Sequence, residues 1–310
     1  MSGIKILGTG KYVPEKIITN DDWAKLVETS DEWIVQRTGM KERHFAADDE
    51  TTTSMGAAAV KLAIEDAGID PQEVGALIVA TVSADNYSPS DACLIQRDLG
   101  LRDNMIAFDI SAGCSGFVFG LETMRGLLMS GGFKYGVLVA SEILSRKMDK
   151  TDRSTCVLFG DGAAAAVISL DDNSEYYSCI GVHGDDELIK VPVPNGPIYM
   201  DGQATYKFAV SSVPKLINDV MEKAGVSPDD IDMFLLHQAN LRIIEAVQKR
   251  LKQPDEKFFI NINKYGNTSA ASVALAMDEA KKEGKLKPGM KVLLAGFGAG
   301  KTYGAIIFEW

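Results

Sequence analysis

Cys114 stands where a thiol can act as a nucleophile. It follows the strand-like segment 105–110 and precedes segment 115–130, in which apolar residues recur at helical spacing. The thiol is therefore expected at a helix N-terminus, where free backbone N–H groups and the positive end of the helix dipole stabilise a thiolate. Gly113 and Gly116 flank it and leave room for a substrate. The alternative is a buried cysteine that serves only as a small apolar residue.

Two further polar residues, His237 and Asn267, fit a role beside this thiol. His237 ends the apolar run 234–236, which places it at the carboxyl edge of a strand, where α/β sheets bind their ligands. Asn267 lies in the loop-like segment 265–272, where it could simply cap the following helix. A thiol, an imidazole and a carboxamide together supply a nucleophile and two neutral donors for a developing enolate oxygen. A structural histidine and a capping asparagine remain open as alternatives.

The spacing of the cysteines and histidines predicts neither a metal site nor a disulfide. The four cysteines contain no Cys-x-x-Cys pair and do not cluster in the sequence with the three histidines, so metal-ligand spacing is missing. We expect reduced thiols, no metal and no cofactor. These residues are Cys93, Cys114, Cys156, Cys179, His44, His183 and His237.

A faint internal repeat indicates how these residues are positioned. Segment 67–74 is similar to segment 224–231, and in both a helical pattern ends in glycine, turns through proline and enters an apolar run. Short apolar runs that alternate with helical patterns are typical of α/β folds with helices on both faces of the sheet. We predict two similar halves, 1–170 and 171–310, with mostly parallel central sheets. Cys114 and Asn267 then occupy equivalent junctions and meet between the halves.

Composition and charge exclude several functional classes. The chain has 310 residues and a formal net charge of −11, which argues against general affinity for nucleic acid. Its start lacks a signal-peptide pattern, and no stretch approaches the roughly 20 apolar residues of a membrane span. We therefore expect a cytoplasmic protein that binds neither membrane nor nucleic acid. An acidic partner requires a local basic patch.

Two glycine-rich segments resemble nucleotide-binding motifs only superficially. Segment 296–302 ends in Gly-Lys-Thr, but Ala295 stands where a phosphate-binding loop needs its first glycine, and a strand rather than a helix follows. Gly8 and Gly10 lack the third glycine of a dinucleotide fingerprint, and no Gly-x-Ser-x-Gly sequence occurs. A dehydrogenase and a serine hydrolase are therefore not supported.

Six segments together point to one family. They are Thr29–Gly39, Ala112–Phe117, Thr151–Thr155, Phe159–Ala163, His237–Arg242 and Tyr265–Ser272. Through them the chain resembles the β-ketoacyl-acyl-carrier-protein synthases III, which are thiolase-fold condensing enzymes, over essentially its whole length. The resemblance implies an αβαβα fold of thiolase type. It also implies the reaction that starts fatty-acid synthesis, in which a short acyl-CoA such as acetyl-CoA condenses with malonyl-acyl carrier protein.

The resemblance assigns roles to the residues of the reaction centre. Cys114 would carry the acyl group, while His237 and Asn267 would hydrogen bond the malonyl thioester carbonyl during decarboxylation. The backbone N–H groups of Cys114 and Ala299 would form an oxyanion hole. Phe297 would shelter the centre, and Phe159 would line the acyl pocket.

It also implies where the two substrates bind. CoA would contact Trp33, Arg37, Arg153 and Asn240. The carrier protein would contact the helix after His237 through Gln238, Ala239, Asn240, Leu241, Arg242, Lys249 and Arg250, with Lys207 nearby. Three of these basic residues recur at i, i+7 and i+8, which supplies the local basic patch required above. Members of this fold are usually homodimers, and we expect one here.

Two departures from the family and three rival functions remain. The stretch Val191–Tyr206 looks short, and Lys301 stands where an apolar residue is usual, so the preferred primer is open. Lys301 would either change the packing behind the active-site turn or recognise an acidic substituent. The rivals are a starter ketosynthase of a polyketide or secondary-metabolite pathway, a thiolase-fold acyl-CoA thioesterase, and an acyl-binding regulatory protein without turnover.

Overall fold

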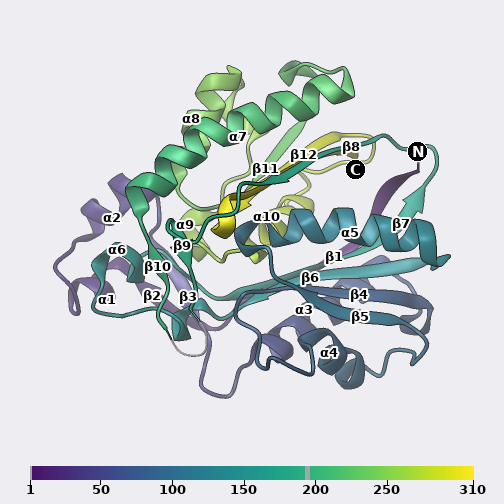
Figure 1. Cartoon of the computed structure of the whole chain (residues 1–310), viewed down its shortest axis with the longest axis horizontal. Helices are drawn as coiled ribbons and strands as arrows, with labels where there is room; N and C mark the ends of the chain where they lie inside the picture. Colours follow the sequence, from purple (N-terminus) through teal and green to yellow (C-terminus); the bar gives the residue numbers. More distant parts are fainter. Residues whose placement is uncertain (1, 193–195) are drawn as a thin grey trace.

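Two mixed β-sheets form the framework of the protein in the computed structural model, which describes residues 2–192 and 196–310 (Figure 1). The first has the order β1-β7-β6-β4-β5 and comprises Gly3–Tyr12, Gly162–Asp171, Tyr135–Glu142, Val74–Ala80 and Ile106–Ile110 respectively. The second has the order β11-β12-β13-β8 and comprises Met233–Leu236, Lys291–Gly298, Thr302–Glu309 and Tyr176–Val182. Taken in reverse, the second order is β8-β13-β12-β11, which corresponds strand by strand to β1-β7-β6-β4 of the first sheet. The first sheet has one additional strand, β5.

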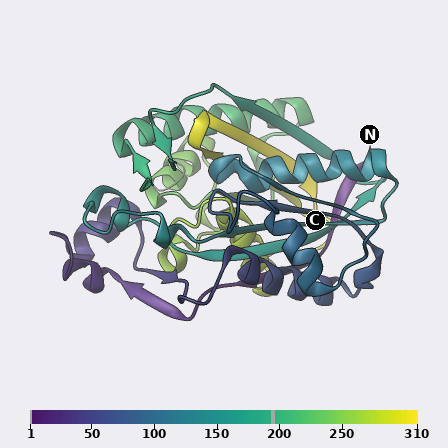
Figure 2. The same ribbon diagram turned by 60° about the horizontal axis from the view of Figure 1, so that its bottom comes forward.

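Helices cover these sheets in three layers, which gives the five-layer αβαβα arrangement expected from the resemblance (Figures 1 and 2). Helices α5 (Gly116–Gly131) and α10 (Ala271–Lys282) lie between the sheets. Helices α3 (Thr52–Ala67) and α4 (Asp91–Leu99) cover the first sheet, while α7 (Gly202–Ala224) and α8 (Leu241–Leu251) cover the second. Within residues 2–192 and 196–310, no helix has the length and apolar character needed to cross a membrane.

Shorter elements gather at one end of these layers, beside α8 (Figures 1 and 2). They are β2 (Lys16–Thr19), α1 (Asn20–Ala24), α2 (Asp31–Thr38), β3 (Glu42–Phe45), α6 (Arg153–Cys156), β9 (Ile189–Lys190), β10 (Tyr199–Met200) and α9 (Ile262–Tyr265). Of these, α2, α6, β9 and β10 contribute residues to the lining of the cavity described below.

The repeat seen in the sequence corresponds to two equivalent helix-turn-strand units. Helix α3 ends at Gly68 and helix α7 ends at Gly225, and both glycines adopt the left-handed conformation that terminates a helix. A proline-initiated 3₁₀ turn follows in each case and leads into β4 or β11. This equivalence supports our proposal that 1–170 and 171–310 are the two halves of the chain.

The pairing of the strands corrects one part of the sequence prediction, because the sheets are mixed rather than mostly parallel. Strand β4 pairs in parallel with β5 and β6, but β7 pairs antiparallel with both β6 and β1. The second sheet has one parallel pair, β11 with β12, and two antiparallel pairs. Strand direction was not readable because strands covered on both faces are continuous apolar runs in either orientation.

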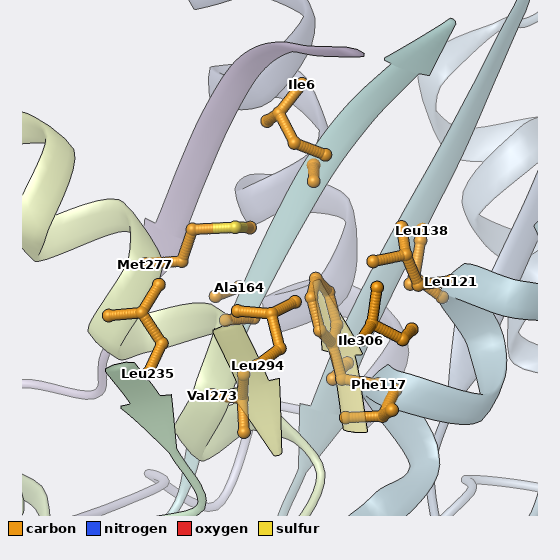
Figure 3. Packing of buried hydrophobic residues seen from close by; sticks show 14 of the residues in the cluster. Ile6, Phe117, Leu121, Leu138, Ala164, Leu235, Val273, Met277, Leu294 and Ile306 are labelled. Atoms are coloured by element: carbon orange, nitrogen blue, oxygen red, sulfur yellow. The ribbon is translucent and has the colours of Figure 1, made fainter. Parts of the chain in front are cut away.

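The central layer is held by apolar side chains from both sheets (Figure 3). Phe117 and Leu121 of α5 and Val273 and Met277 of α10 have no exposed surface. They pack in one cluster with residues of both sheets, among them Leu138, Ala164, Leu235, Leu294 and Ile306. Because close-packed interiors resist displacement, this cluster fixes the positions of the N-terminal ends of α5 and α10.

Candidate active site

One cavity of about 410 Å³ brings the predicted reaction centre together. Its lining includes Cys114, Phe159, His237, Asn267 and Phe297. Cys114 comes from the first half of the chain, whereas His237 and Asn267 come from the second, as the repeat had predicted. The cavity therefore lies where the two halves meet.

Cys114 lies in a 3₁₀ turn, Gly113–Ser115, that leads directly into α5. The hairpin between β12 and β13 packs against this turn so closely that a Cβ atom on Gly298 would lie 2.5 Å from the Cys114 nitrogen. Gly113 has a φ of 55°, and a Cβ atom there would lie 3.0 Å from the Ala299 nitrogen. Both glycines are thus required for the two backbones to approach, and the approach brings the N–H groups of Cys114 and Ala299 close together.

Cys114 is partly exposed, and its surroundings oppose the stabilisation of a thiolate that the helix N-terminus was expected to provide. Burial raises the pKa of the thiol to about 12, an effect larger than the opposing contribution of the neighbouring Ser269 side chain. The resting residue is therefore a thiol at neutral pH, and its proton must leave as the bond to the substrate forms. The sequence pattern located the residue correctly but carried no information on how deeply the fold would enclose it.

His237 is a neutral hydrogen-bond donor. It directly follows β11, and its backbone N–H donates to the Ala295 carbonyl at 2.8 Å. Burial lowers the pKa of the imidazole to about 3. The ring Nδ1 lies 2.6 Å from the Ser272 hydroxyl oxygen, which also accepts the Gln238 backbone N–H at 3.3 Å. A Ser272 hydroxyl that donates to Nδ1 would hold the ring proton on Nε2, the nitrogen that the proposed function uses as a donor.

The Asn267 carboxamide is oriented by backbone contacts. Its N–H donates to the Leu158 carbonyl at 2.9 Å, and its carbonyl accepts the Gly160 N–H at 3.0 Å. The side-chain oxygen accepts the Ser269 N–H at 2.8 Å, which leaves the NH₂ group as the donor available to a ligand. This turn precedes α10, whose N-cap is Ala270. Asn267 therefore does not occupy the N-cap position that the simpler interpretation proposed.

The residues expected at the CoA end of the cavity also lie together. The guanidinium carbons of Arg37 and Arg153 lie 4.5 Å and 4.9 Å from the centre of the Trp33 ring. Trp33, Arg37 and Asn240 line the cavity. The Asn240 side chain donates to the Arg37 carbonyl at 2.9 Å and caps α8 by accepting the Arg242 N–H at 2.9 Å. It thus joins α8 to the end of α2.

The expected carrier-protein residues divide into exposed and buried groups. Lys207 on α7 and Arg242, Lys249 and Arg250 on α8 are exposed, while Ala239 and Leu241 are partly buried. The prediction that Gln238 contacts the carrier protein is wrong, because only 1% of its surface is exposed. Its side chain is hydrogen bonded to the backbones of Leu236, Phe259 and Asn261. It fixes the loop after β11 and presents no surface to a partner.

Sequence reasoning did not single out the serines that support the reaction centre. Ser272 orients His237, and Ser269 adopts a φ of 50°, which is unusual for a residue other than glycine. Both lie in the 265–272 segment, but a serine near the start of a helix is so common that it carries no signal. In the described parts of the chain, no three His, Cys, Asp or Glu side chains are grouped to hold a metal ion.

The structure also locates the two departures from the family. The Nζ atom of Lys301 lies 2.6 Å from Oδ2 of Asp185, so this charge is paired within the chain. Of the short stretch Val191–Tyr206, residues 193–195 lie outside the described residues. The stretch contains β10 and the start of α7, and Met200 and Thr205 from it line the cavity.

Comparisons with known proteins show the family of this chain. The family pattern described as 3-oxoacyl-[acyl-carrier-protein] synthase III matches residues 108–183, and its C-terminal counterpart matches residues 221–310. The β-ketoacyl-[acyl-carrier-protein] synthase III of Clostridium acetobutylicum is 43% identical, with 100% of this chain and 99% of the relative aligned. That of Aquifex aeolicus is 43% identical, with 99% of this chain and 100% of the relative aligned.

Solved structures give the same result. The crystal structure of the Aquifex aeolicus synthase superposes with a TM-score of 0.96 at 44% identity, covering 99% of this chain and 100% of the other. The priming β-ketosynthase of the R1128 polyketide pathway superposes with a TM-score of 0.89 at 34% identity, covering 98% and 96%. This chain belongs to the 3-oxoacyl-[acyl-carrier-protein] synthase III family.

Proposed function

We propose that the protein catalyses the condensation that starts fatty-acid synthesis, joining a short acyl-CoA primer to malonyl-acyl carrier protein. The observation that carries this proposal is the arrangement of Cys114, neutral His237 and the free NH₂ group of Asn267 around one cavity. One nucleophile and two uncharged donors suit a reaction in which negative charge develops on a thioester oxygen. Family membership supports the same reaction.

In the first half-reaction, the Cys114 sulfur attacks the thioester carbon of the acyl-CoA. Its proton leaves as the new C–S bond forms, and the negative charge passes to the carbonyl oxygen. The backbone N–H groups of Cys114 and Ala299 stabilise this oxyanion. The intermediate collapses, the bond to the CoA sulfur breaks, and this sulfur takes up the proton that Cys114 lost, so that CoA leaves as a thiol. An S-acyl cysteine remains.

In the second half-reaction, Nε2–H of His237 and the Asn267 NH₂ group donate to the thioester carbonyl of malonyl-acyl carrier protein. Loss of CO₂ leaves its bonding electrons as an enolate, whose oxygen these donors hold. The enolate carbon attacks the acyl carbon on Cys114 and expels the cysteine thiolate. The thiolate recovers a proton, and 3-oxoacyl-carrier protein is released.

The partners follow from the surfaces beside the cavity. CoA is proposed to lie against Trp33, with its phosphates near Arg37 and Arg153, since guanidinium groups bind phosphate well. The acidic carrier protein is proposed to bind the exposed basic residues Arg242 and Lys249 of α8, together with Arg250 and Lys207. We also propose that the protein is a cytoplasmic homodimer. It would need neither a metal nor a cofactor, because acyl-CoA enters the reaction as a substrate.

Mass spectrometry of the intact protein and its peptides tests this function. The wild type and Cys114→Ala are incubated with acetyl-CoA, butyryl-CoA and longer acyl-CoAs, and malonyl-acyl carrier protein is then added. We expect acyl mass on the Cys114 peptide of the wild type, lost as 3-oxoacyl carrier protein forms, and no adduct in the variant. Absence of an adduct with every primer refutes the acyl-enzyme. An adduct that is only hydrolysed identifies a thioesterase instead.

A second candidate is a starter ketosynthase of a polyketide pathway, favoured by the similarity to the R1128 priming enzyme. It would use the same three residues and differ in its primer and acceptor. Parallel assays with carrier proteins of fatty-acid and polyketide synthesis separate the two. Preference for the fatty-acid carrier, by kcat/KM, supports the first function.

A further inference from the structure

Lys301 belongs to the active-site turn, Ala299–Lys301, which joins β12 to β13. Its φ of 47° is a left-handed conformation that glycine adopts freely and a lysine does not. Its ammonium group lies 2.6 Å from the Asp185 carboxylate, and the side chains are only 30% and 10% exposed. The hydrogen bond from Lys301 is also the main cause that lowers the pKa of Asp185. The side chain thus has a defined partner that a glycine would lack.

Asp185 connects this pair to one wall of the cavity. Its carboxylate accepts the Leu188 N–H at 2.9 Å and the Glu187 N–H at 3.2 Å, which shapes the segment leading into β9. The Leu188 carbonyl then accepts the Asp201 N–H at 2.8 Å, beside β10. These two strands pair antiparallel, with Ile189 opposite Met200. Both of these residues line the cavity.

Lys301, the second member of the pair, is connected to the reaction centre. The Lys301 carbonyl accepts the His183 N–H at 3.3 Å, which is a second link between the active-site turn and the segment after β8. The same turn carries Ala299, whose N–H approaches that of Cys114. A chain of contacts therefore leads from the oxyanion hole through Lys301 and Asp185 to Ile189 and Met200.

We propose that the Lys301–Asp185 ion pair determines primer specificity by holding the paired strands β9 and β10 at a fixed distance from the active-site turn. The inference rests on the proposed function, because it concerns the acyl group that enters the same cavity. With the pair intact, Ile189 and Met200 narrow the cavity that the acyl group enters, and short acyl groups fit. Without it, strands β9 and β10 are less restrained and longer acyl groups gain access. Lys301 and Asp185 are positioning residues in this scheme, since neither contacts the reacting atoms.

Four variants test the pair. Asp185→Asn keeps an acceptor for the Leu188 N–H and removes only the charge, while Lys301→Asn tolerates the left-handed backbone. The third combines both changes, and the fourth exchanges the charges as Asp185→Lys with Lys301→Asp. Glu175→Gln is the matched control, since it breaks an ion pair with Lys291 on the same sheet, 3.1 Å long and remote from the cavity lining.

The measurement is kcat/KM for acylation of Cys114 by acetyl-CoA, hexanoyl-CoA and decanoyl-CoA. We expect the ratio of hexanoyl-CoA to acetyl-CoA to rise at least about threefold in each single variant and by the same factor in the double variant, because residues acting as one pair are not additive. The charge exchange should restore part of the wild-type ratio. The control should leave the ratio unchanged.

Two results overturn the inference. One is an unchanged primer ratio in all variants while Cys114 is still acylated normally. The other is an equal loss of rate for every primer, accompanied by a lower melting temperature, which would show that the pair only stabilises the fold. Failure of the proposed function is distinguishable from both, because the wild type would then form no acyl-Cys114 with any primer.

Discussion

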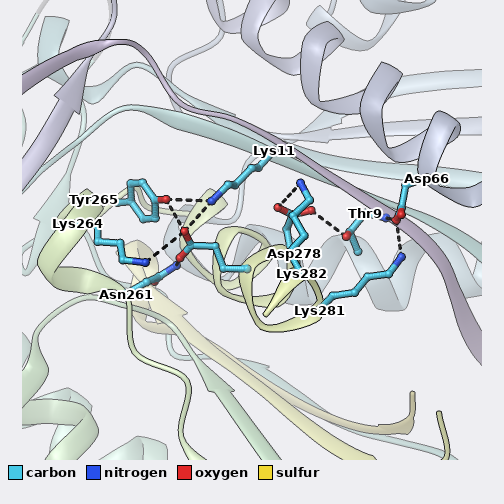
Figure 4. Close-up of polar contacts among 10 residues, drawn as sticks. Thr9, Lys11, Asp66, Asn261, Lys264, Tyr265, Asp278, Lys281 and Lys282 are labelled. Carbon is cyan, nitrogen blue, oxygen red and sulfur yellow. Dashed lines mark hydrogen bonds and ion pairs between the residues drawn. The ribbon is translucent and has the colours of Figure 1, made fainter. Parts of the chain in front are cut away.

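Helix α10 begins at the reaction centre and ends at a contact with β1 and α3. The buried polar side chains at its two ends differ in charge and in their partners. Before its first turn, Asn267 and Ser269 lie buried and uncharged, and the Ser269 hydroxyl makes no hydrogen bond of good geometry within the described residues. At its last turns, Asp278 and Glu279 are also buried but charged, and each carboxylate has a lysine partner, Lys282 for Asp278 and Lys11 for Glu279. The Oδ2 atom of Asp278 makes this ion pair but no hydrogen bond of good geometry within the described residues (Figure 4).

The charged end is a network between the two halves. The Glu279 carboxylate accepts from Lys11 at 2.7 Å, from the Tyr265 hydroxyl at 2.6 Å and from Asn261 at 2.9 Å (Figure 4). Asp278 accepts from Thr9 at 2.9 Å and pairs with Lys282 at 2.9 Å. Further pairs, Lys264 with Glu279 and Lys281 with Asp66, extend the network.

This difference between the two ends of α10 suggests that one end serves the reaction and the other serves the stability of the fold. A buried polar group with all its partners holds the fold together, whereas a donor left without a partner can be completed by a substrate. We therefore expect changes at the neutral end to lower activity and changes at the charged end to lower stability. Three predictions test this separation, and a further one compares Glu279 with a second buried glutamate, Glu142 of β6; they are given in order of decreasing effect.

The largest effect is expected for Asn267→Ala. Removal of one of two donors to the developing enolate should lower the condensation rate by about 10²–10³. Acylation of Cys114 should change much less than condensation, while the melting temperature should fall modestly, because the variant also removes the side-chain oxygen that accepts the buried Ser269 N–H. Stopped assays of each half-reaction and thermal unfolding measure these quantities, with the exposed Asn104→Ala as control. A parallel loss of acylation and condensation would contradict the assigned role.

Glu279→Ala should destabilise the protein by about 3 kcal/mol, because it leaves Lys11 without its carboxylate in a half-buried place. Activity at 25 °C should stay close to that of the wild type. Chemical denaturation measures the stability. The exposed Glu283→Ala, one turn later, should change it by less than about 0.5 kcal/mol. Equal effects of the two variants would show that the network contributes nothing beyond ordinary surface pairs.

The dependence of stability on pH should differ in sign for two buried glutamates. Burial raises the pKa of Glu142 from 4.5 to about 7. The folded state therefore binds its proton more tightly than the unfolded state, and stability falls as pH rises from about 4.5 through 7. For Glu279, burial is outweighed by hydrogen bonds from Lys11, Tyr265 and Asn261 that lower the pKa, so its contribution is lost as pH falls below the ordinary value.

Glu142→Gln should therefore abolish a decline of about 2 kcal/mol between pH 5 and pH 8. Denaturation at both pH values in wild type and variant measures it. The exposed Glu73→Gln should leave the decline as it is. An undiminished decline in Glu142→Gln would mean that this carboxyl is ionised in the folded protein at pH 5.

The smallest effect is expected for Ser272→Ala, which removes the hydroxyl that holds the Nδ1 atom of His237. The ring would then divide between two tautomers, and condensation should slow by roughly tenfold, with acylation nearly unchanged. Nitrogen chemical shifts of the imidazole report the tautomer directly. The exposed Ser130→Ala serves as control. A slower rate with an unchanged tautomer would show that Ser272 acts on packing alone.

The sequence predicted where helices and turns begin and end better than it predicted strand direction or the partners of charged side chains. The helix ends at Gly68 and Gly225 and the turn at Cys114 are local features, because glycine, proline and apolar spacing act within a few residues. Strand direction, the burial of Gln238 and the partner of Lys301 depend on segments far apart in the chain. No local pattern reports such contacts.

For the reaction centre, the amino-acid sequence was enough to predict Cys114, His237 and Asn267, since each stands at a junction that its neighbours specify. Their protonation and orientation depend on the fold. Burial raises the pKa of the thiol and lowers that of the imidazole, and Ser272 lies within hydrogen-bond distance of the Nδ1 atom of His237. The physical reason is that desolvation and hydrogen-bond partners are properties of the packed interior, which is assembled from both halves of the chain.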